Sequence, residues 1–93
     1  MTVILLPGAE DDLDEAFRYY ESRQRGLGDK FLDEFRHAVD RVIQFPHGWH
    51  SMDKTYRRCQ LHRFPYGIIY RVDQADLDIV ITAVMQLNRR PHF

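Results

Sequence analysis

Seven side chains of this sequence could together cleave RNA without a metal ion. Such cleavage needs a base for the 2′-hydroxyl, an acid for the leaving oxygen and cations for the phosphate charge. Two groups that can transfer a proton and five arginines meet these needs: His62, Tyr70, Arg58, Arg63, Arg71, Arg89 and Arg90. Among them, His62, Tyr70, Arg63 and Arg89 are the candidates for a catalytic role.

The arginines also suit binding without catalysis, because a guanidinium group presents a fork of donors that fits carboxylates and phosphates. The predicted contact surface combines these arginines with two aromatic residues: Arg58, Arg63, Arg71, Arg89, Arg90, Tyr19 and Trp49. Two alternatives stay open. The arginines could form a solvated sheet face with ion pairs to acidic helices, and Trp49 could cover the edge of the core.

Metal-ligand residues are present but sparse. His47 and His50 are three residues apart, and Asp53 follows them. A metal site needs further ligands, and also residues that hold the ligands in place through hydrogen bonds. Helix capping and solvation account for the acidic residues of the first half: Asp11, Asp12, Asp14 and Glu15. We therefore expect no metal and no cofactor.

Charge is unevenly distributed along the chain. Residues 1–46 carry a net charge of −4 and residues 47–93 a net charge of +3, so the total is −1. A general nucleic-acid binder usually shows a strong basic excess, which is missing here. The second half can still present a local basic surface.

Size and composition predict one domain over residues 1–93, with enough apolar residues for one core. Cys59 is the single cysteine, so no internal disulfide can form, which fits a reducing cytosol. No stretch approaches the ~20 apolar residues that a membrane span needs. The expected location is the cytoplasm, away from membranes.

Apolar residues recur at helical spacing in two segments of the first half. The first segment begins at Ala9 and is closed by Gly26 and Gly28. The second covers residues 31–43, with Asp29 as its N-cap. The short link between them predicts an antiparallel helical hairpin. A core stripe is expected at Phe17, Tyr20, Phe31, Phe35 and Phe45, with Cys59 as a small core residue.

Four segments have the composition of strands: residues 2–6, 56–63, 66–72 and 77–87. Residues 47–55 show no period and are expected to form a loop. The last three strands follow one another closely and must be antiparallel, with 77–87 the most central. The result is an α+β fold of order β-α-α-β-β-β, in which the helical hairpin packs on one face of a small antiparallel sheet. The other face is left partly open.

The second half also resembles a known family. Residues 57–66 read RRCQLHRFPY and residues 68–72 read IIYRV, similar to the pattern R…RFPY.I.Y.V of ParE-type toxins. The segment AVMQLNRRP at 83–91 is similar to the last strand of that family and its R.P tail. In the first half, Tyr19-Tyr20-Glu21 and the Leu27-Gly28 entry to the second helix match as well. Nearly the whole chain therefore resembles the RelE/ParE superfamily, and within it the ParE-like branch.

This resemblance implies a RelE-like fold and the toxin component of a type II toxin–antitoxin system. It also implies a cognate antitoxin that wraps the toxin with its C-terminal segment, in a hetero-oligomer. ParE-like members poison DNA gyrase, and RelE-like members cut mRNA on the ribosome. We favour gyrase inhibition through protein contact, without catalysis. The alternatives are a ribosome-dependent endoribonuclease and a non-toxic member that acts as a co-repressor with its antitoxin.

Two positions depart from the family pattern. Gln86 stands where many members carry histidine, and its amide does not exchange protons at neutral pH. Phe93 stands where many members have tryptophan or tyrosine, and it lacks the hydroxyl that RelE-like ribonucleases place near that end. Both departures favour contact over catalysis.

Overall fold

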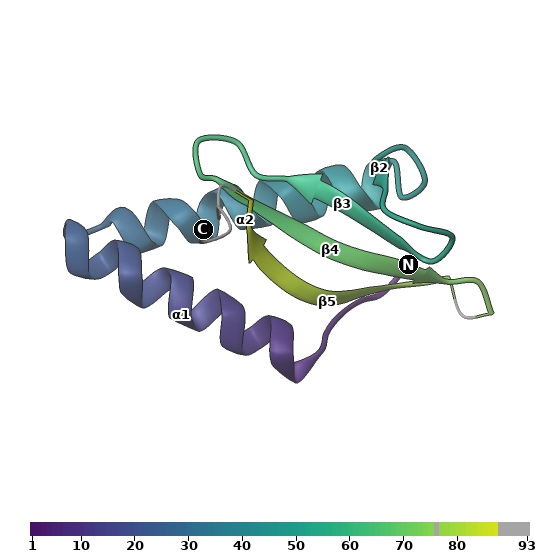
Figure 1. The fold of residues 1–93 in the computed structure, drawn as a ribbon, viewed down its shortest axis with the longest axis horizontal. Coiled ribbons are helices and arrows are strands. Elements are labelled where there is room, and N and C mark those ends of the chain that lie inside the picture. Colours follow the sequence, from purple (N-terminus) through teal and green to yellow (C-terminus); the bar gives the residue numbers. More distant parts are fainter. Residues whose placement is uncertain (76, 88–93) are drawn as a thin grey trace, which may run out of the picture.

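The computed structural model describes residues 1–75 and 77–87. Within these residues the elements follow the predicted order, with one additional short strand (Figure 1). Their bounds are β1 Val3–Leu5, α1 Pro7–Arg23, α2 Leu27–Gln44, β2 His50–Ser51, β3 Tyr56–Gln60, β4 Tyr66–Asp73 and β5 Asp78–Gln86. The α+β class and the helical hairpin are confirmed.

The described strands form one mixed sheet in the order β1-β5-β4-β3-β2. All neighbours are antiparallel except β1, which pairs parallel with β5. The purely antiparallel sheet was therefore wrong at this edge, and β4 rather than β5 is the middle strand. The expected loop over 47–55 also contains β2, which pairs with Arg57 and Arg58.

The helical hairpin is tighter than the sequence suggested. Helix α1 begins at Pro7, whose fixed φ and missing N–H suit the first helical position. Gly26, with a φ of 87°, precedes α2, so Asp29 lies inside the first turn and is not the N-cap. Gly28 belongs to α2 and does not close α1. Both glycine N–H groups donate to the Glu21 carboxylate, at 3.0 Å.

Gly28 leaves no room for a side chain. A Cβ there would lie 2.9 Å from the carbonyl oxygen of Phe17, so the two helices approach each other closely at this point. Glu21 and Gly28 together explain why the link between the helices can be so short.

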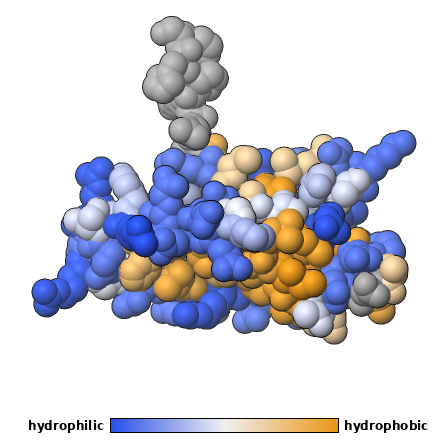
Figure 2. All heavy atoms as spheres, turned by 90° about the horizontal axis from the view of Figure 1, so that it is seen from below, coloured by the Kyte–Doolittle hydropathy of each residue, from blue (hydrophilic) through white to orange (hydrophobic). Residues whose placement is uncertain are grey.

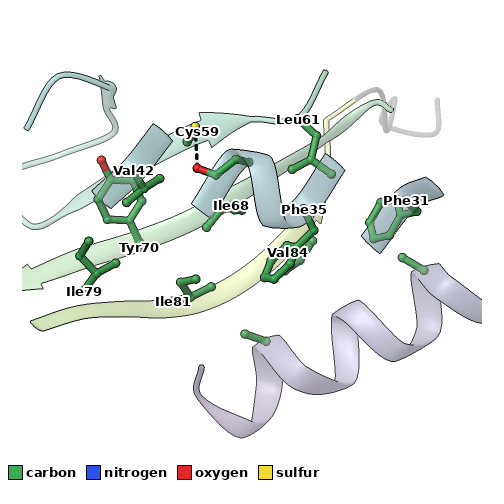
Figure 3. Packing of buried hydrophobic residues seen from close by; sticks show 13 residues of the cluster. Phe31, Phe35, Val42, Cys59, Leu61, Ile68, Tyr70, Ile79, Ile81 and Val84 are labelled. Carbon is green, nitrogen blue, oxygen red and sulfur yellow. Dashed lines mark hydrogen bonds between the residues drawn. The ribbon is translucent and has the colours of Figure 1, made fainter. Parts of the chain in front are cut away.

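The core lies between the helical hairpin and one face of the sheet (Figure 3). Its largest buried side chains are Phe31 and Tyr70, and Cys59 is buried there as predicted. Tyr20 stacks on Phe31, with ring centroids 5.4 Å apart. Phe45 was wrongly placed in the core: α2 ends at Gln44, and the Phe45 side chain is 57% exposed.

No helix among the described residues is both long and apolar enough to cross a bilayer.

Candidate functional site

The face of the sheet opposite the helices carries Arg58. Arg58 pairs with Ile69, and Ile69 pairs with Ala83, so the three side chains share one face across three strands. Ile69 and Val80 are buried but do not belong to the core under the helices. The open face is therefore a mixed surface, in which an arginine lies beside small and apolar side chains.

Gly67 determines where Arg58 points. A Cβ at Gly67 would lie 3.0 Å from Cγ of Arg58 and 3.3 Å from its Cδ. It would also lie 3.3 Å from Cδ1 of Leu87. The stem of Arg58 thus crosses β4 over a residue without a side chain and extends toward the end of β5.

Arg58 thereby reaches a groove of about 730 Å³ between α1 and β5. Helix α1 supplies four residues spaced along one of its faces, and the sheet supplies the rest. The lining residues are Asp12, Glu15, Ala16, Tyr19, Arg58, Tyr66 and residues 83–87.

One wall of this groove is an unpaired strand edge. Strand β1 pairs with residues 79–81 of β5. Among the described residues, no strand pairs with the rest of β5, after Ile81, on the β1 side. There the N–H of Val84 donates to Oδ2 of Asp12, at 3.0 Å. A side chain of α1 thus takes the place that an adjacent strand would occupy.

Tyrosines and carboxylates lie close together on the α1 side of the groove. The pKa of Tyr66 is raised, mainly by burial and further by the nearby Tyr19 and Glu15. Tyr19 is 48% exposed, and the Arg23 guanidinium lies 4.7 Å from the centre of its ring. This end of the groove therefore offers acceptors and an aromatic face to a cation, and Arg58 offers donors to an anion.

Tyr70 lies on the opposite face, in the core. Its side chain is completely buried, and its hydroxyl donates to the carbonyl oxygen of Pro46 at 2.6 Å. Burial raises its pKa to about 12, the Cys59 thiol adds to this rise and Arg57 opposes it. A substrate on the open face could not reach this hydroxyl, so the structure corrects the placing of Tyr70 beside the arginines.

His62 and Arg63 are exposed, but they do not lie on a strand. Strand β3 ends at Gln60, and the chain turns back over residues 61–65, where Arg63 has a φ of 70°. The N–H of Leu61 donates to the carbonyl oxygen of Tyr66 across this turn. Neither residue lines the groove. The predicted grouping of His62 and Arg63 with Arg58 is therefore not found.

The remaining predicted residues are separated as well. Arg71 pairs with Tyr56 and Val80 on the open face but does not line the groove. Arg89 and Arg90 lie outside the described residues. Of the predicted contact residues, Arg58 and Tyr19 are the two that the structure brings to one site.

Trp49 covers the edge of the core, one of its two predicted roles. Its indole N–H donates to the carbonyl oxygen of Arg41 at 3.1 Å, and its own carbonyl accepts from Arg57 at 2.9 Å. The half-buried ring packs against the core. In the described part of the chain, no three His, Cys, Asp or Glu side chains are grouped so that they could hold a metal ion.

The α1 side of the groove differs from the expectation for its acidic residues. Asp12 and Glu15 were assigned to capping and solvation, whereas Asp12 satisfies a strand N–H and Glu15 lines the groove. The signal was present in the spacing of Asp12, Glu15, Ala16 and Tyr19, which places them on one helical face.

A second groove, of about 570 Å³, lies on the opposite side of α1. It is mainly apolar, lined by Leu5, Leu13, Phe17 and Leu32 with Glu10 and Asp14 at its rim. Figure 2, which views the molecule from the side of α1, shows apolar side chains gathered among hydrophilic ones. We call this the apolar groove, and the groove beside β5 the polar groove.

Comparisons with known proteins agree with this description. The model of a family described as the ParE toxin of the type II toxin–antitoxin system parDE matches residues 3–90. Toxin ParE2 of Mycobacterium tuberculosis is 36% identical over 74 residues, covering 78% of this chain and 70% of that protein.

Two solved structures share the fold. A structure of the chromosomal ParDE toxin–antitoxin system from P. aeruginosa matches with a TM-score of 0.80 and 21% identity, over 95% of this chain and 97% of that one. The isolated E. coli RelE toxin matches with a TM-score of 0.68 and 13% identity, over 96% and 86% of the two chains.

Proposed function

The chain belongs to the ParE toxin family of type II toxin–antitoxin systems, and we propose that it inhibits DNA gyrase in the cytoplasm through protein–protein contact. In this proposal a cognate antitoxin neutralises the toxin by covering the surface that would otherwise meet gyrase. The toxin itself makes and breaks no covalent bond.

The separation of Tyr70 from Arg58 is the observation that supports contact rather than cleavage. The Tyr70 hydroxyl lies in the core, and Arg58 lies on the other face with Ile69 and Ala83. General acid–base catalysis needs a proton-transfer group within hydrogen-bond reach of the reacting atoms. An arginine among apolar residues is instead typical of the centre of a protein interface.

Membership of the ParE family supports gyrase as the target, since the ParE-like branch is the one linked to gyrase. The overall charge of −1 fits this choice, because it gives no broad attraction to nucleic acid. Arg58 would contribute a bidentate contact to a carboxylate of the target.

A purified supercoiling assay tests the proposal. Plasmid DNA, ATP and gyrase are incubated with the toxin, and the products are scored for loss of supercoiling and for trapped linear DNA. We expect inhibition with linear product, reversed by the antitoxin. Arg58→Glu should raise the half-inhibitory concentration at least tenfold. Arg36→Glu is the matched control, since Arg36 is exposed on α2 and, among the described residues, pairs with Asp33 alone.

No inhibition by folded toxin at high micromolar concentration would contradict the gyrase proposal. Cleavage of mRNA on purified ribosomes would then identify the endoribonuclease alternative. Normal growth of cells that express the toxin alone would identify the non-toxic co-repressor.

A further inference from the structure

The open face of the sheet carries two arginines over an apolar floor, and the helical hairpin lies on the other face. We propose that the target protein covers the open face with an amphipathic helix, whose carboxylates bind Arg58 and Arg71. Apolar side chains of the same helix pack on Ile69 and Val80. The inference rests on the proposed function, because the target is the partner that supplies this helix. It adds the extent of the contact and the chemistry of the segment that makes it.

Two rows of opposed side chains form the middle of the open face. Each row crosses β5, β4 and β3, and the residues are Ala83, Ile69 and Arg58 in one row and Val80, Arg71 and Tyr56 in the other. Arg58 and Arg71 are diagonal neighbours on one strand pair, a separation of about 7–8 Å that long side chains can bridge. Arg71 lies outside the polar groove, so the two arginines extend the contact surface beyond it.

The centre of this face is apolar and almost completely covered. Ile69 is 6% exposed and Val80 is 5% exposed. The side chains around them, Arg58, Arg71 and Tyr56, are half-buried. An arginine lays its apolar stem over such neighbours and keeps its charged end outermost. The open face therefore presents two guanidinium groups with an apolar floor between them.

Neither arginine has a carboxylate partner in the described part of the chain. Arg18 pairs with Asp14 and Arg36 pairs with Asp33, whereas no such pair involves Arg58 or Arg71. A guanidinium group binds a carboxylate through two parallel hydrogen bonds. The attraction is stronger where the groups are partly removed from water. Charge complementarity therefore calls for two carboxylates on the segment that covers this face.

Backbone pairing favours a helix as the covering segment. Residues 67–71 of β4 are paired with β3 on one side and with β5 on the other, so their N–H and C=O groups are already used. A segment lying on this face must satisfy its own backbone groups, as a helix does. Residues four apart on a helix lie about 5–6 Å from each other on one side. Two acidic residues at that spacing, beside an apolar residue, match the diagonal of Arg58 and Arg71.

Two aspartates limit how the helix can lie. Asp73 and Asp78 are paired at the end of the open face where β4 turns into β5. They repel acidic side chains, so the carboxylates of the helix lie over Arg58 and Arg71 and not at this end. A Lys or Arg of the helix would be favourable beside the aspartates.

Arg71→Glu tests the inference in the purified supercoiling assay. We expect its half-inhibitory concentration to rise at least tenfold, because a carboxylate replaces the fork that binds one. Arg71→Lys keeps the charge and loses the fork, so its half-inhibitory concentration should rise about threefold. Arg36→Glu, on the helical side of the molecule, should stay within twofold of wild type. Circular dichroism confirms that each variant is folded.

Photo-crosslinking locates the partner without depending on inhibition. A benzophenone amino acid is placed at Gln60, which is exposed and shares a face of β3 with Arg58, and the toxin is irradiated with gyrase and plasmid DNA. We expect a crosslink to a gyrase subunit, in a peptide with two acidic residues one helical turn apart. The same amino acid at Arg36 is the control and should give no such crosslink.

The outcomes separate this inference from the proposed function. Wild-type inhibition by folded Arg71→Glu overturns the acidic helix and leaves gyrase inhibition intact. A crosslink from Gln60 to DNA, or to a second toxin chain, also overturns it, because nucleic acid or a second copy then occupies the open face. Failure of folded wild-type toxin to inhibit gyrase contradicts both proposals.

Discussion

The two grooves beside α1 differ in what lines them and in how they relate to the core. The apolar groove is formed by Leu5, Leu13 and Leu32, which pack against the core and leave only part of their surface open. The polar groove is formed by charged and aromatic groups, Glu15, Tyr19 and Arg58, and by a strand edge. One helix thus presents two chemically different surfaces on opposite sides.

This difference separates stability from recognition. Partly buried leucines stabilise the fold through burial, which is not directional. Exposed charged groups and outward backbone groups contribute little to stability but select a partner through geometry and charge. Substitutions beside the apolar groove should therefore act mainly on folding, and substitutions beside the polar groove mainly on binding.

Leu13→Ala should give the largest effect. The side chain packs against the core, so its truncation should lower the free energy of unfolding by about 2 kcal/mol, at the lower end of the range for core leucines because Leu13 is only half-buried. Urea denaturation measures this change. Glu10→Ala at the rim of the same groove should change it by less than about 0.5 kcal/mol.

The same Leu13→Ala variant also tests whether the antitoxin binds at the polar groove rather than at the apolar groove. Its affinity for the antitoxin should stay within about threefold of wild type once the folded fraction is corrected, a range that corresponds to less than about 1 kcal/mol. A greater loss than that caused by Arg58→Glu would mean that the antitoxin is recognised mainly at the apolar groove.

Alkaline pH should destabilise the fold mainly through Tyr70 in the core, which has the largest pKa shift. Burial raises the pKa of Tyr70 from an ordinary 10.0 to about 12, so the unfolded chain releases this proton more readily than the folded protein. The stability from neutral Tyr70 is complete below pH 10 and is lost as the pH rises from about 10 to about 12.

Thermal unfolding across this pH range checks the prediction. Tyr70→Phe should be less stable at pH 8, because the hydrogen bond to Pro46 is lost, by about 1 kcal/mol. It should also show a smaller fall in melting temperature between pH 10 and pH 12. A fall in melting temperature equal to that of the wild type would show that Tyr70 does not set the alkaline transition.

Arg58→Glu should weaken antitoxin binding about tenfold, or about 1.4 kcal/mol, without unfolding the toxin. Arg58 lines the polar groove, and reversing its charge replaces a donor for carboxylates with a group that repels them. Isothermal titration calorimetry measures the dissociation constant, with circular dichroism as the check on folding. Arg63→Glu is the matched control, since Arg63 does not line the groove, and its effect should be less than about twofold. Equal losses for the two variants would argue for a diffuse basic surface.

Much of the fold could be predicted because local pattern and packing agree. The spacing of Phe31, Phe35 and Ala38 predicts one buried face of α2, and the alternation of Arg58 and Cys59 predicts which side of β3 faces the core. These features depend only on the spacing of apolar residues along a helix or a strand. Phe45 failed because the end of α2 turns it away from the core, which no period reveals.

The site could be predicted only in part, because it depends on contacts between distant residues. Asp12 and Val84 are 72 positions apart, and the short length of β1 leaves that edge of β5 to Asp12. Tyr70 is close to the arginines in the sequence, but side chains alternate along β4, and its position places it on the core face. Sequence spacing therefore identified Arg58 and Tyr19 but not the groove that joins them.

Gly67→Ala should have the smallest effect and test how Arg58 reaches the polar groove. The added Cβ would lie 3.0 Å from Cγ of Arg58, so the arginine stem must shift away from β4. We expect antitoxin binding to weaken about threefold, less than 1 kcal/mol, while the free energy of unfolding changes little because Ala also reduces the entropy of the unfolded chain. In the Arg58→Ala background, Gly67→Ala should have no further effect on the dissociation constant, since the stem that it displaces is gone. An undiminished threefold loss in that background would show that Gly67 acts through Leu87 or the strand backbone rather than through Arg58.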